Sequence, residues 1–236
     1  TLETDIQVGS CAPKIFSYTQ RSVLDSTGMQ FYPDGLGRGR GRLEHDSGQY
    51  DHACDILFSS GCAMLLRRDM LVDIGLFDAD LFAYCEDTDL GLRAQLAGWQ
   101  CRFVPAAIVY HKYSASSAPY SPLKAFLVER NRLWVAVRCL PLPLLLVSPV
   151  FTLLRLGTFA MGLFSRRGAV WRFAQSHSVA GVFSVFVRAV CASLWGLPRA
   201  WRKRQLTQRQ RRISMWKSLT WITRFGMGVR EIALKE

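Results

Sequence analysis

The chain has 236 residues, of which 50% are hydrophobic and 20% are charged. This composition excludes an intrinsically disordered protein and allows one large domain, or one domain with an appendage, around a real core. Residues 1–120 carry 10 Lys and Arg against 15 Asp and Glu, a net charge of −5, whereas residues 121–236 carry 20 against 3, a net charge of +17. The basic half therefore indicates a polyanionic partner, and the acidic half is suited to cations or to chemistry.

The seven cysteines are odd in number and form no C-x-x-C pair. Since no signal peptide stands at the start of the chain, this usage predicts a reducing cytoplasm and structural thiols, and it argues against a disulfide or zinc framework. The chain begins at Thr1 and runs at once into irregular sequence. We therefore expect a fragment whose N-terminal part is missing.

Short extended segments are predicted near the N-terminus. Residues 12–18 suit either a short strand or a loop, and residues 21–25 and 29–32 suit two strands on either side of a turn at Gly28. The glycine- and arginine-rich stretch 33–42 predicts a mobile surface loop, with an anion-binding flap as the alternative.

Residues 55–66 predict a buried strand that is interrupted by Ser59-Ser60-Gly61. A glycine inside a strand often marks a close approach of backbone or ligand. Residues 67–75 then predict a short helix, with Asp69 near its start and Gly75 where a helix-ending glycine belongs.

Three acidic residues stand at the start of the next predicted helix, residues 87–97. Glu86, Asp87 and Asp89 fall in its first turn, where free N–H groups and the helix dipole favour carboxylates. Helix capping is the simplest interpretation of this pattern taken alone, and catalysis is the alternative. Asp89 is also spaced for an i,i+4 ion pair with Arg93.

An extended segment follows and ends on a histidine. Residues 101–104 and 107–110 predict strand structure that bends at Pro105, and His111 comes directly after it. A single histidine in this position is either structural or a metal ligand. Ser121 then caps a further helix, with a proline at its first position.

The character of the chain changes after residue 138. Two charge-free runs, residues 139–154 and 173–187, contain 16 and 15 residues, fewer than the roughly 20 that a spanning helix needs. We expect helices that lie in a membrane interface, or a re-entrant hairpin, in place of a true span. Residues 199–217 carry eight basic residues and no acidic one, with tryptophans nearby, which suits anionic headgroups. A solvated basic helix is the alternative, and nucleic-acid binding is not expected because no recognised motif accompanies the charge.

A series of short motifs follows in order over residues 55–135. It comprises Ser60-Gly61-Cys62-Ala63-Met64-Leu65-Leu66-Arg67-Arg68, Gly75-Leu76-Phe77-Asp78, Phe82, Glu86-Asp87-x-Asp89-Leu90-x-x-Arg93, Gly98-Trp99, Val104-Pro105, His111 and Arg130-Asn131. This series resembles the family 2 inverting glycosyltransferases of the GT-A fold, above all rhamnosyltransferase-like and galactofuranosyltransferase-like members that build bacterial cell-surface polysaccharides. The resemblance favours a catalytic acid pair over a helix cap.

The resemblance implies roles for the acid pair and the histidine. Asp87 would be the general base that takes the proton from the acceptor hydroxyl as its oxygen attacks the anomeric carbon, and Glu86 would orient that hydroxyl or support the base. His111 would join a divalent metal, Mg²⁺ or Mn²⁺, that bridges the two phosphates of the nucleotide and stabilises the departing diphosphate.

The resemblance also implies a set of residues that bind substrate. Gly61 would leave room beside the sugar, and Trp99 would pack beneath the site. Asp78, Arg130 and Asn131 complete the expected set.

The nucleotide-binding half of such enzymes, with its D-x-D metal-binding motif, precedes these residues. Nothing in residues 1–55 supplies it, so we expect that about a hundred residues are missing upstream and that this chain binds the donor poorly. The predicted fold is α/β. Residues 1–120 are expected to be the C-terminal, acceptor-side portion of a GT-A catalytic domain, and residues 121–236 a helical, basic, membrane-associating region.

The predicted function is the transfer of a sugar from a nucleotide-diphosphate sugar to a glycan or to a polyprenyl-diphosphate-linked acceptor. The expected location is the cytoplasmic face of the inner membrane, with peripheral attachment to an anionic membrane surface, and this fragment alone is expected to be inactive. Two alternatives stay open. One is a non-catalytic membrane-docking or scaffold module, and the other is a metal-dependent hydrolase that uses His45, His52 and His111.

Overall fold

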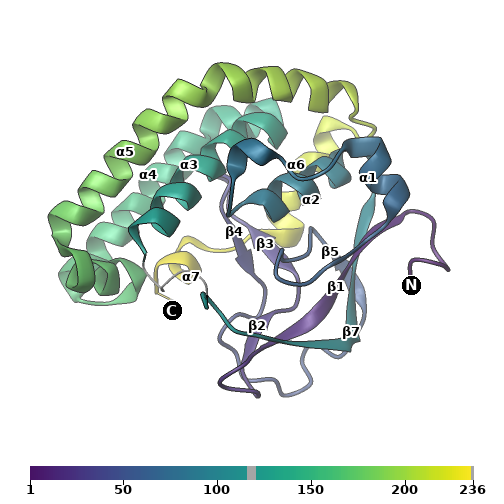
Figure 1. Cartoon of the computed structure of the whole chain (residues 1–236), viewed down its shortest axis with the longest axis horizontal. Helices are drawn as coiled ribbons and strands as arrows, with labels where there is room; N and C mark the ends of the chain where they lie inside the picture. Colours follow the sequence, from purple (N-terminus) through teal and green to yellow (C-terminus); the bar gives the residue numbers. More distant parts are fainter. Residues whose placement is uncertain (116–120, 235–236) are drawn as a thin grey trace.

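The computed structural model describes residues 1–115 and 121–234, which form a mixed α/β structure (Figure 1). Its main sheet has five strands in the order β2-β1-β7-β5, with β6 also paired to β1, and a two-stranded sheet of β3 and β4 accompanies it. The strands are β1 (Val8–Ser17), β2 (Leu24–Ser26), β3 (Met29–Phe31), β4 (Gly37–Gly39), β5 (Cys54–Ile56), β6 (Leu65–Leu66) and β7 (Gln100–His111).

Two parallel strands, β1 and β7, form the centre of the main sheet. β1 is buried along nearly its whole length, and its pairing with β7 continues to Ser17 opposite His111. The pairing skips residues 105–107, so β7 bulges at Pro105 and the predicted bend is confirmed. The sequence left residues 12–18 open as a strand or a loop, and the structure shows a strand as far as Ser17.

The stretch 33–42, predicted as a mobile surface loop, is anchored to the rest of the molecule. β4 lies within it and pairs with β3. The guanidinium of Arg42 contacts the carboxylate of Asp25, and Arg38 donates a hydrogen bond to the backbone carbonyl of Ile232 at 3.2 Å. The surface-loop prediction is therefore wrong, because arginines that look solvated in the sequence have carboxylate and carbonyl partners far along the chain.

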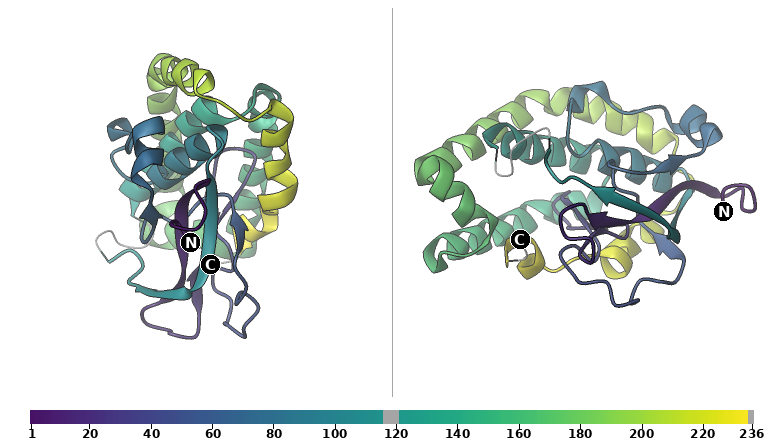
Figure 2. Two further views of the ribbon diagram at one scale, coloured as in Figure 1. Left: turned by 90° about the vertical axis from the view of Figure 1, so that its right-hand side faces the viewer. Right: turned by 60° about the horizontal axis from the view of Figure 1, so that its bottom comes forward.

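Helices occupy most of the remaining chain. α1 and α2 confirm the two short helices predicted before β7, and α3 confirms the helix capped by Ser121, whose hydroxyl accepts from the N–H of Lys124. α5 runs along the outside of α3 and α4 (Figures 1 and 2) and consists of two helical segments that meet at Ser178. The helical elements are α1 (Arg68–Ile74), η1 (Ala79–Leu81), α2 (Glu86–Leu96), α3 (Pro122–Cys139), α4 (Leu142–Ser165), α5 (Gly168–Arg209), α6 (Met215–Phe225) and α7 (Val229–Leu234).

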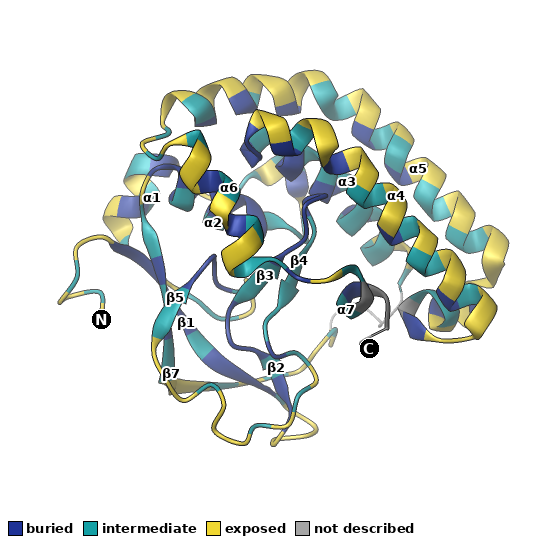
Figure 3. Ribbon diagram, turned by 180° about the vertical axis from the view of Figure 1, so that it is seen from behind, coloured by how far each residue is buried: buried dark blue, intermediate teal, exposed yellow. Residues whose placement is uncertain are grey.

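The two apolar runs of the sequence lie in helices that are longer than the runs themselves. Leu142–Ser165 and Val170–Arg209 are long and apolar enough to cross a membrane by length and composition. Only 17% and 11% of their most apolar windows are buried inside the structure, and their outer faces are exposed (Figure 3). The helix lengths predicted from the charge-free runs were therefore too short, because the helices continue through Arg155 and other charged residues.

One hydrophobic core joins the two halves of the sequence. Its buried members come from the strands and their loops and from α2, α3, α4 and α6: Phe31, Leu57, Phe58, Leu81, Leu92, Leu96, Val135, Ala136, Cys139, Leu140, Leu144 and Trp221. Gly91 allows α2 to approach this core closely, since a Cβ there would lie 2.1 Å from the Cβ of Phe58. The position of α2 therefore depends on packing against both halves of the chain.

Three buried charged residues and the partly buried Glu129 join α3, α4 and the 33–42 stretch. The guanidinium of Arg155 donates to Asp34 at 2.7 Å and to both carboxylate oxygens of Glu129 at 2.7 and 2.9 Å. Arg132 donates to Glu129 at 2.8 Å and lies 3.3 Å from a carboxylate oxygen of Asp34. Burial raises the pKa of Glu129, but the two guanidinium groups lower it by more, to about 2. Arg155, which interrupts an apolar run in the sequence, therefore serves a buried ion network.

We predict that Glu129→Gln lowers the free energy of unfolding by about 3 kcal/mol at neutral pH, because it leaves two buried guanidinium groups with one carboxylate. The folded-state pKa lies below the ordinary value of 4.5. The stabilisation is therefore complete above that value and is lost as the pH falls toward 2. Urea unfolding of both forms across this acid range measures the difference, and a difference that does not shrink with falling pH contradicts the assignment.

Candidate active site

The loop before α2 has a strained backbone. Phe82, Tyr84 and Cys85 have φ values of 63°, 66° and 64°, in the left-handed region that residues with a side chain rarely adopt. Each such residue costs roughly 1 kcal/mol or more, so surrounding contacts must stabilise the loop. The acid pair follows this loop directly, as the first two residues of α2.

Two neighbouring residues of α3 hold the loop, and we call them the Arg130–Asn131 clamp. The side-chain nitrogen of Asn131 lies 2.9, 2.8 and 2.8 Å from the carbonyl oxygens of Leu81, Ala83 and Tyr84. Arg130 donates to the carbonyl of Leu81 at 3.0 Å and to the side-chain oxygen of Asn131 at 2.8 Å. Asn131 is fully buried. The structure therefore places it as a support for the loop, with no exposed surface toward a substrate.

Asp87 is half-buried near the start of α2. Its Oδ2 accepts a hydrogen bond from the backbone N–H of Gly61 at 2.8 Å, and its Oδ1 accepts from the backbone N–H of Thr88 at 2.7 Å. Burial raises the pKa of Asp87, and the hydrogen bonds lower it by less. The carboxylate is therefore more basic than an ordinary aspartate, which suits a proton acceptor.

Glu86 lies beside Asp87 with one oxygen unsatisfied. Within the described part of the chain, no donor reaches its buried Oε2. Burial raises the pKa of Glu86, and the charge of Asp87 raises it further. A Cβ on Gly61 would lie 3.1 Å from Oε1 of Glu86, so any larger residue there would crowd the acid pair. A buried carboxylate oxygen without a partner is suited to accept a hydrogen bond from a substrate hydroxyl.

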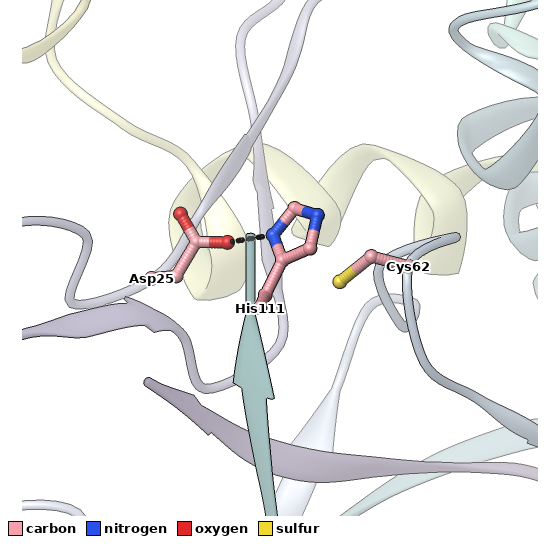
Figure 4. A group of neighbouring side chains, drawn as sticks. All are labelled: Asp25, Cys62 and His111. Atoms are coloured by element: carbon pink, nitrogen blue, oxygen red, sulfur yellow. Dashed lines mark hydrogen bonds and ion pairs between the residues drawn. The ribbon is translucent and has the colours of Figure 1, made fainter. Parts of the chain in front are cut away.

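His111 forms a second cluster with Asp25 and Cys62 (Figure 4). Its Nδ1 lies 2.7 Å from Oδ2 of Asp25, and the thiol of Cys62 completes a group whose ligand atoms all lie within 4.8 Å of one another. Arg42 contacts the other oxygen of Asp25. Asp25 reaches His111 because β2 and β7 both pair with the same end of β1.

The acid pair and the His111 cluster border the same short loop. Gly61 binds Asp87 through its N–H, and the next residue, Cys62, lies beside His111. Burial raises the pKa of Cys62, and the carboxylates of Asp25 and Asp87 raise it further. A proton acceptor and a potential metal ligand therefore flank one loop, as a single site requires.

The His111 cluster fits part of a divalent metal site. An imidazole nitrogen and a carboxylate oxygen suit Mn²⁺, whereas a thiolate from Cys62 would favour softer ions. Among residues 1–115 and 121–234, no other group of three His, Cys, Asp or Glu side chains could hold a metal. The hydrolase alternative requires His45 and His52 to share a metal site with His111, but neither of them belongs to this cluster.

Two D-x-D spacings occur in the chain, at residues 78–80 and 87–89, but their carboxylates have other partners. Asp78 and Asp80 both lie 2.6 Å from the ammonium group of Lys203. Asp89 is buried against Arg93 at 2.8 Å, which confirms the predicted i,i+4 pair. Neither spacing therefore offers a free pair of carboxylates for a metal.

The other predicted substrate residues lie away from the acid pair. Asp78 and Arg130 line a separate cavity of about 480 Å³ between η1, α3 and α5. Burial raises the pKa of Asp78, but the ammonium group of Lys203 and the other donors around it lower it by more. Trp99 packs against a hydrophobic cluster formed by α1 and α2 and donates to Asp73 at 2.8 Å.

Sequence patterns did not reveal Asp25 or Cys62 as site residues. Asp25 is 86 positions from His111 in the chain, and the two become neighbours only through strand pairing. The sequence carries only weak signals for these two site residues: Asp25 ends a predicted strand before the turn at Gly28, and Cys62 follows Gly61.

Comparison with known proteins identifies the family of the chain. Residues 43–227, more than half of the chain, match the sequence profile of glycosyl transferase family group 2. The chain belongs to this family. N-acetylglucosaminyl-diphospho-decaprenol L-rhamnosyltransferase of Mycobacterium tuberculosis is 39% identical over 84 residues, which cover 32% of this chain and 27% of that enzyme. Rhamnosyltransferase WbbL of Escherichia coli K12 is 37% identical over 76 residues, which cover 32% of this chain and 28% of that protein. The match therefore covers little more than a quarter of the length of each of these relatives.

The Arg130–Asn131 clamp can be tested by Asn131→Ala in the full-length enzyme. The change removes the amide donor from the carbonyls of Ala83 and Tyr84 and leaves Arg130 as the donor to Leu81. We expect turnover to fall by about a hundredfold because the acid pair is displaced. Gln95→Ala is the matched control, since that amide also donates to two carbonyls, those of Ile56 and Leu57. Steady-state kinetics and thermal unfolding are measured for both variants, and equal losses of turnover would contradict a specific role for the clamp.

Proposed function

We propose that the chain carries the acceptor side and the catalytic base of an inverting, metal-dependent glycosyltransferase. Its first 120 residues correspond to the C-terminal portion of a GT-A catalytic domain, and a nucleotide-diphosphate sugar is the donor. The rhamnosyltransferase names of the two relatives support rhamnose as the transferred sugar. The diphospho-decaprenol in the name of the mycobacterial relative supports a sugar on a polyprenyl diphosphate as the acceptor, for the synthesis of cell-surface polysaccharide.

The position of Asp87 is the observation that carries the proposal. Its carboxylate is fixed by the N–H of Gly61, is made more basic by burial, and lies beside the unsatisfied oxygen of Glu86. In the proposed reaction, Glu86 orients the acceptor hydroxyl and Asp87 removes its proton as the oxygen attacks the anomeric carbon. Attack from the face opposite the leaving diphosphate inverts the configuration at that carbon.

His111 and Asp25 are the residues that would hold a divalent metal. When bound there, Mg²⁺ or Mn²⁺ would act as a Lewis acid toward the departing diphosphate. The remaining carboxylates needed for the metal would come from a D-x-D motif of the nucleotide-binding half that such enzymes carry.

Membrane attachment through the helical half is part of the proposal. α4 and α5 have apolar outer faces. Trp195, just before the basic segment 199–217, and Trp216, within it, are 91% and 74% exposed. Such exposed tryptophans and arginines suit the interface of the cytoplasmic leaflet, which is anionic. A scaffold without chemistry is less well supported, because it gives no reason for a desolvated acid pair in a glycosyltransferase family member.

Asp87→Asn in the full-length enzyme is predicted to reduce turnover by about 10²- to 10⁴-fold while donor binding is retained. Since the pKa of Asp87 is raised, its ionisation opposes folding at neutral pH. The amide of the variant can accept only one of the two hydrogen bonds from the N–H groups of Gly61 and Thr88, and this loss opposes the gain, so thermal unfolding is measured alongside turnover. The acid limb of the wild-type pH–rate profile should also rise through a pKa above the ordinary carboxyl value of 3.8. Near-normal turnover in the variant would exclude Asp87 as the base.

His111→Ala is predicted to raise the Mn²⁺ concentration for half-maximal activity by about tenfold or more, because it removes the imidazole ligand. His45→Ala is the control, since His45 lies outside the cluster. A Mn²⁺ titration of each variant at saturating donor decides the question. An unchanged titration for His111→Ala would remove this residue from the metal site.

A further inference from the structure

A second hollow lies next to the active site. It is a cavity of about 710 Å³, within the range of roughly 300–1,000 Å³ that small-molecule sites occupy. It lies between the 33–42 stretch, α3, α4 and α5. Most of its wall consists of aliphatic and aromatic side chains from α4 and α5, among them Leu156, Phe159, Leu163, Phe173, Phe183 and Phe186.

One end of this groove is basic. The guanidinium of Arg42 and the ammonium group of Lys124 lie 4.2 and 4.3 Å from the centre of the Tyr113 ring. Lys124 donates to the hydroxyls of Tyr113 and Ser114 at 3.0 and 2.7 Å, and neither hydroxyl neutralises its charge. Burial raises the pKa of Tyr113, but Arg42 and Lys124 lower it by more. Because Asp25 pairs with Arg42, Lys124 contributes most of the positive charge at this end. Elsewhere in the wall, Glu129 and Arg155 compensate each other.

Arg42 and Lys124 connect the basic end to the surroundings of the active site. Arg42 contacts Asp25, which holds His111 at 2.7 Å. Lys124 lies 5.5 Å from the centre of the Tyr84 ring, in the strained loop that leads into the acid pair. An anion held between Arg42 and Lys124 would therefore lie beside both clusters of the site.

The other end of the groove opens on the outer surface of the helices. Val179 and Phe183 line the groove and are 58% and 70% exposed. The outer faces of α4 and α5 are largely exposed (Figure 3). The groove therefore leads from two cations at the active site to an apolar surface.

We propose that this groove binds the isoprenoid diphosphate that carries the acceptor sugar, with the diphosphate between Arg42 and Lys124 and the first isoprene units along α4 and α5. The proposal rests on the proposed function, since a sugar attached to that diphosphate would extend toward Asp87. A free glycan offers nothing for the apolar wall to bind. A protein segment gives no reason for two cations at the end nearest the catalytic residues. A single apolar chain that ends in a diphosphate matches both ends of the groove.

Binding of farnesyl diphosphate to the purified full-length enzyme tests the proposal, with calorimetry as the measurement. Lys124→Ala should weaken binding about tenfold, because it removes a charge-assisted contact to the diphosphate. Lys217→Ala is the matched control on exposed α6 and should change nothing. Farnesol should bind with similar, low affinity to the wild type and to Lys124→Ala.

A second pair of variants tests the apolar wall. Phe183 and Phe164 are both exposed phenylalanines, 70% and 91% accessible, but only Phe183 lines the groove. Phe183→Ser should weaken farnesyl diphosphate binding about fivefold, in line with the loss of apolar contact area, whereas Phe164→Ser should not. Equal effects within either pair of variants would overturn the proposal. The proposal would also be overturned if a diacyl phosphatidylglycerol bound as tightly as farnesyl diphosphate and lost the same affinity in the groove variants. The groove would then take membrane lipid.

The outcome is independent of the catalytic assignment. Asp87→Asn should bind farnesyl diphosphate as the wild type does. If Asp87→Asn retains turnover while the groove variants lose binding, the base assignment fails and the groove stands. If Asp87→Asn is inactive and the groove variants bind normally, the groove proposal fails and the proposed function stands.

Discussion

The hydrogen bonds from the amide of Asn131 to three loop carbonyls are the interaction on which the site depends most. The loop they hold contains three side-chain-bearing residues with left-handed backbone, a conformation that is unfavourable without such support. The loop determines where α2 begins, and α2 begins with the acid pair. Because Asn131 belongs to α3, the position of the acid pair in the first half of the chain is set by a helix of the second half.

Burial and hydrogen bonding act in opposite directions on the acid pair, and the balance gives it its chemistry. The N–H groups of Gly61 and Thr88 stabilise the ionised form of Asp87, as they would in a helix cap. Desolvation is the stronger effect and raises the pKa. A capping carboxylate would show the reverse balance. The pattern that is ambiguous in the sequence thus becomes a basic, desolvated carboxylate in the folded chain.

The charged residues of the helical half fall into two groups, those in a buried ion network and those on the surface. Arg132 and Arg155 are buried and satisfied by Asp34 and Glu129, which fastens α4 to α3 and to the 33–42 stretch. The same network forms part of the wall of the apolar groove. The net charge of +17 in this half therefore overstates its capacity for a polyanionic partner. Within the basic segment 199–217, Arg199, Lys203 and Arg212 also pair with carboxylates of the first half of the chain. The other basic residues of this segment and the basic end of the groove are left to meet anions.

Local pattern in the sequence was enough to place α1, α2 and α3, the bend at Pro105, the Asp89–Arg93 pair and the acid pair at a helix start. Each of these depends on residues within a few positions of one another, where caps, glycines and i,i+4 spacing act directly. The sequence also led to family 2, because the order of the motifs can be read without knowledge of the fold. Tertiary structure alone decided that Asp25 meets His111, that Asn131 supports the loop, and that the 33–42 stretch is anchored. Those contacts join residues tens of positions apart, and strand pairing and helix packing bring them together only when the whole chain has folded.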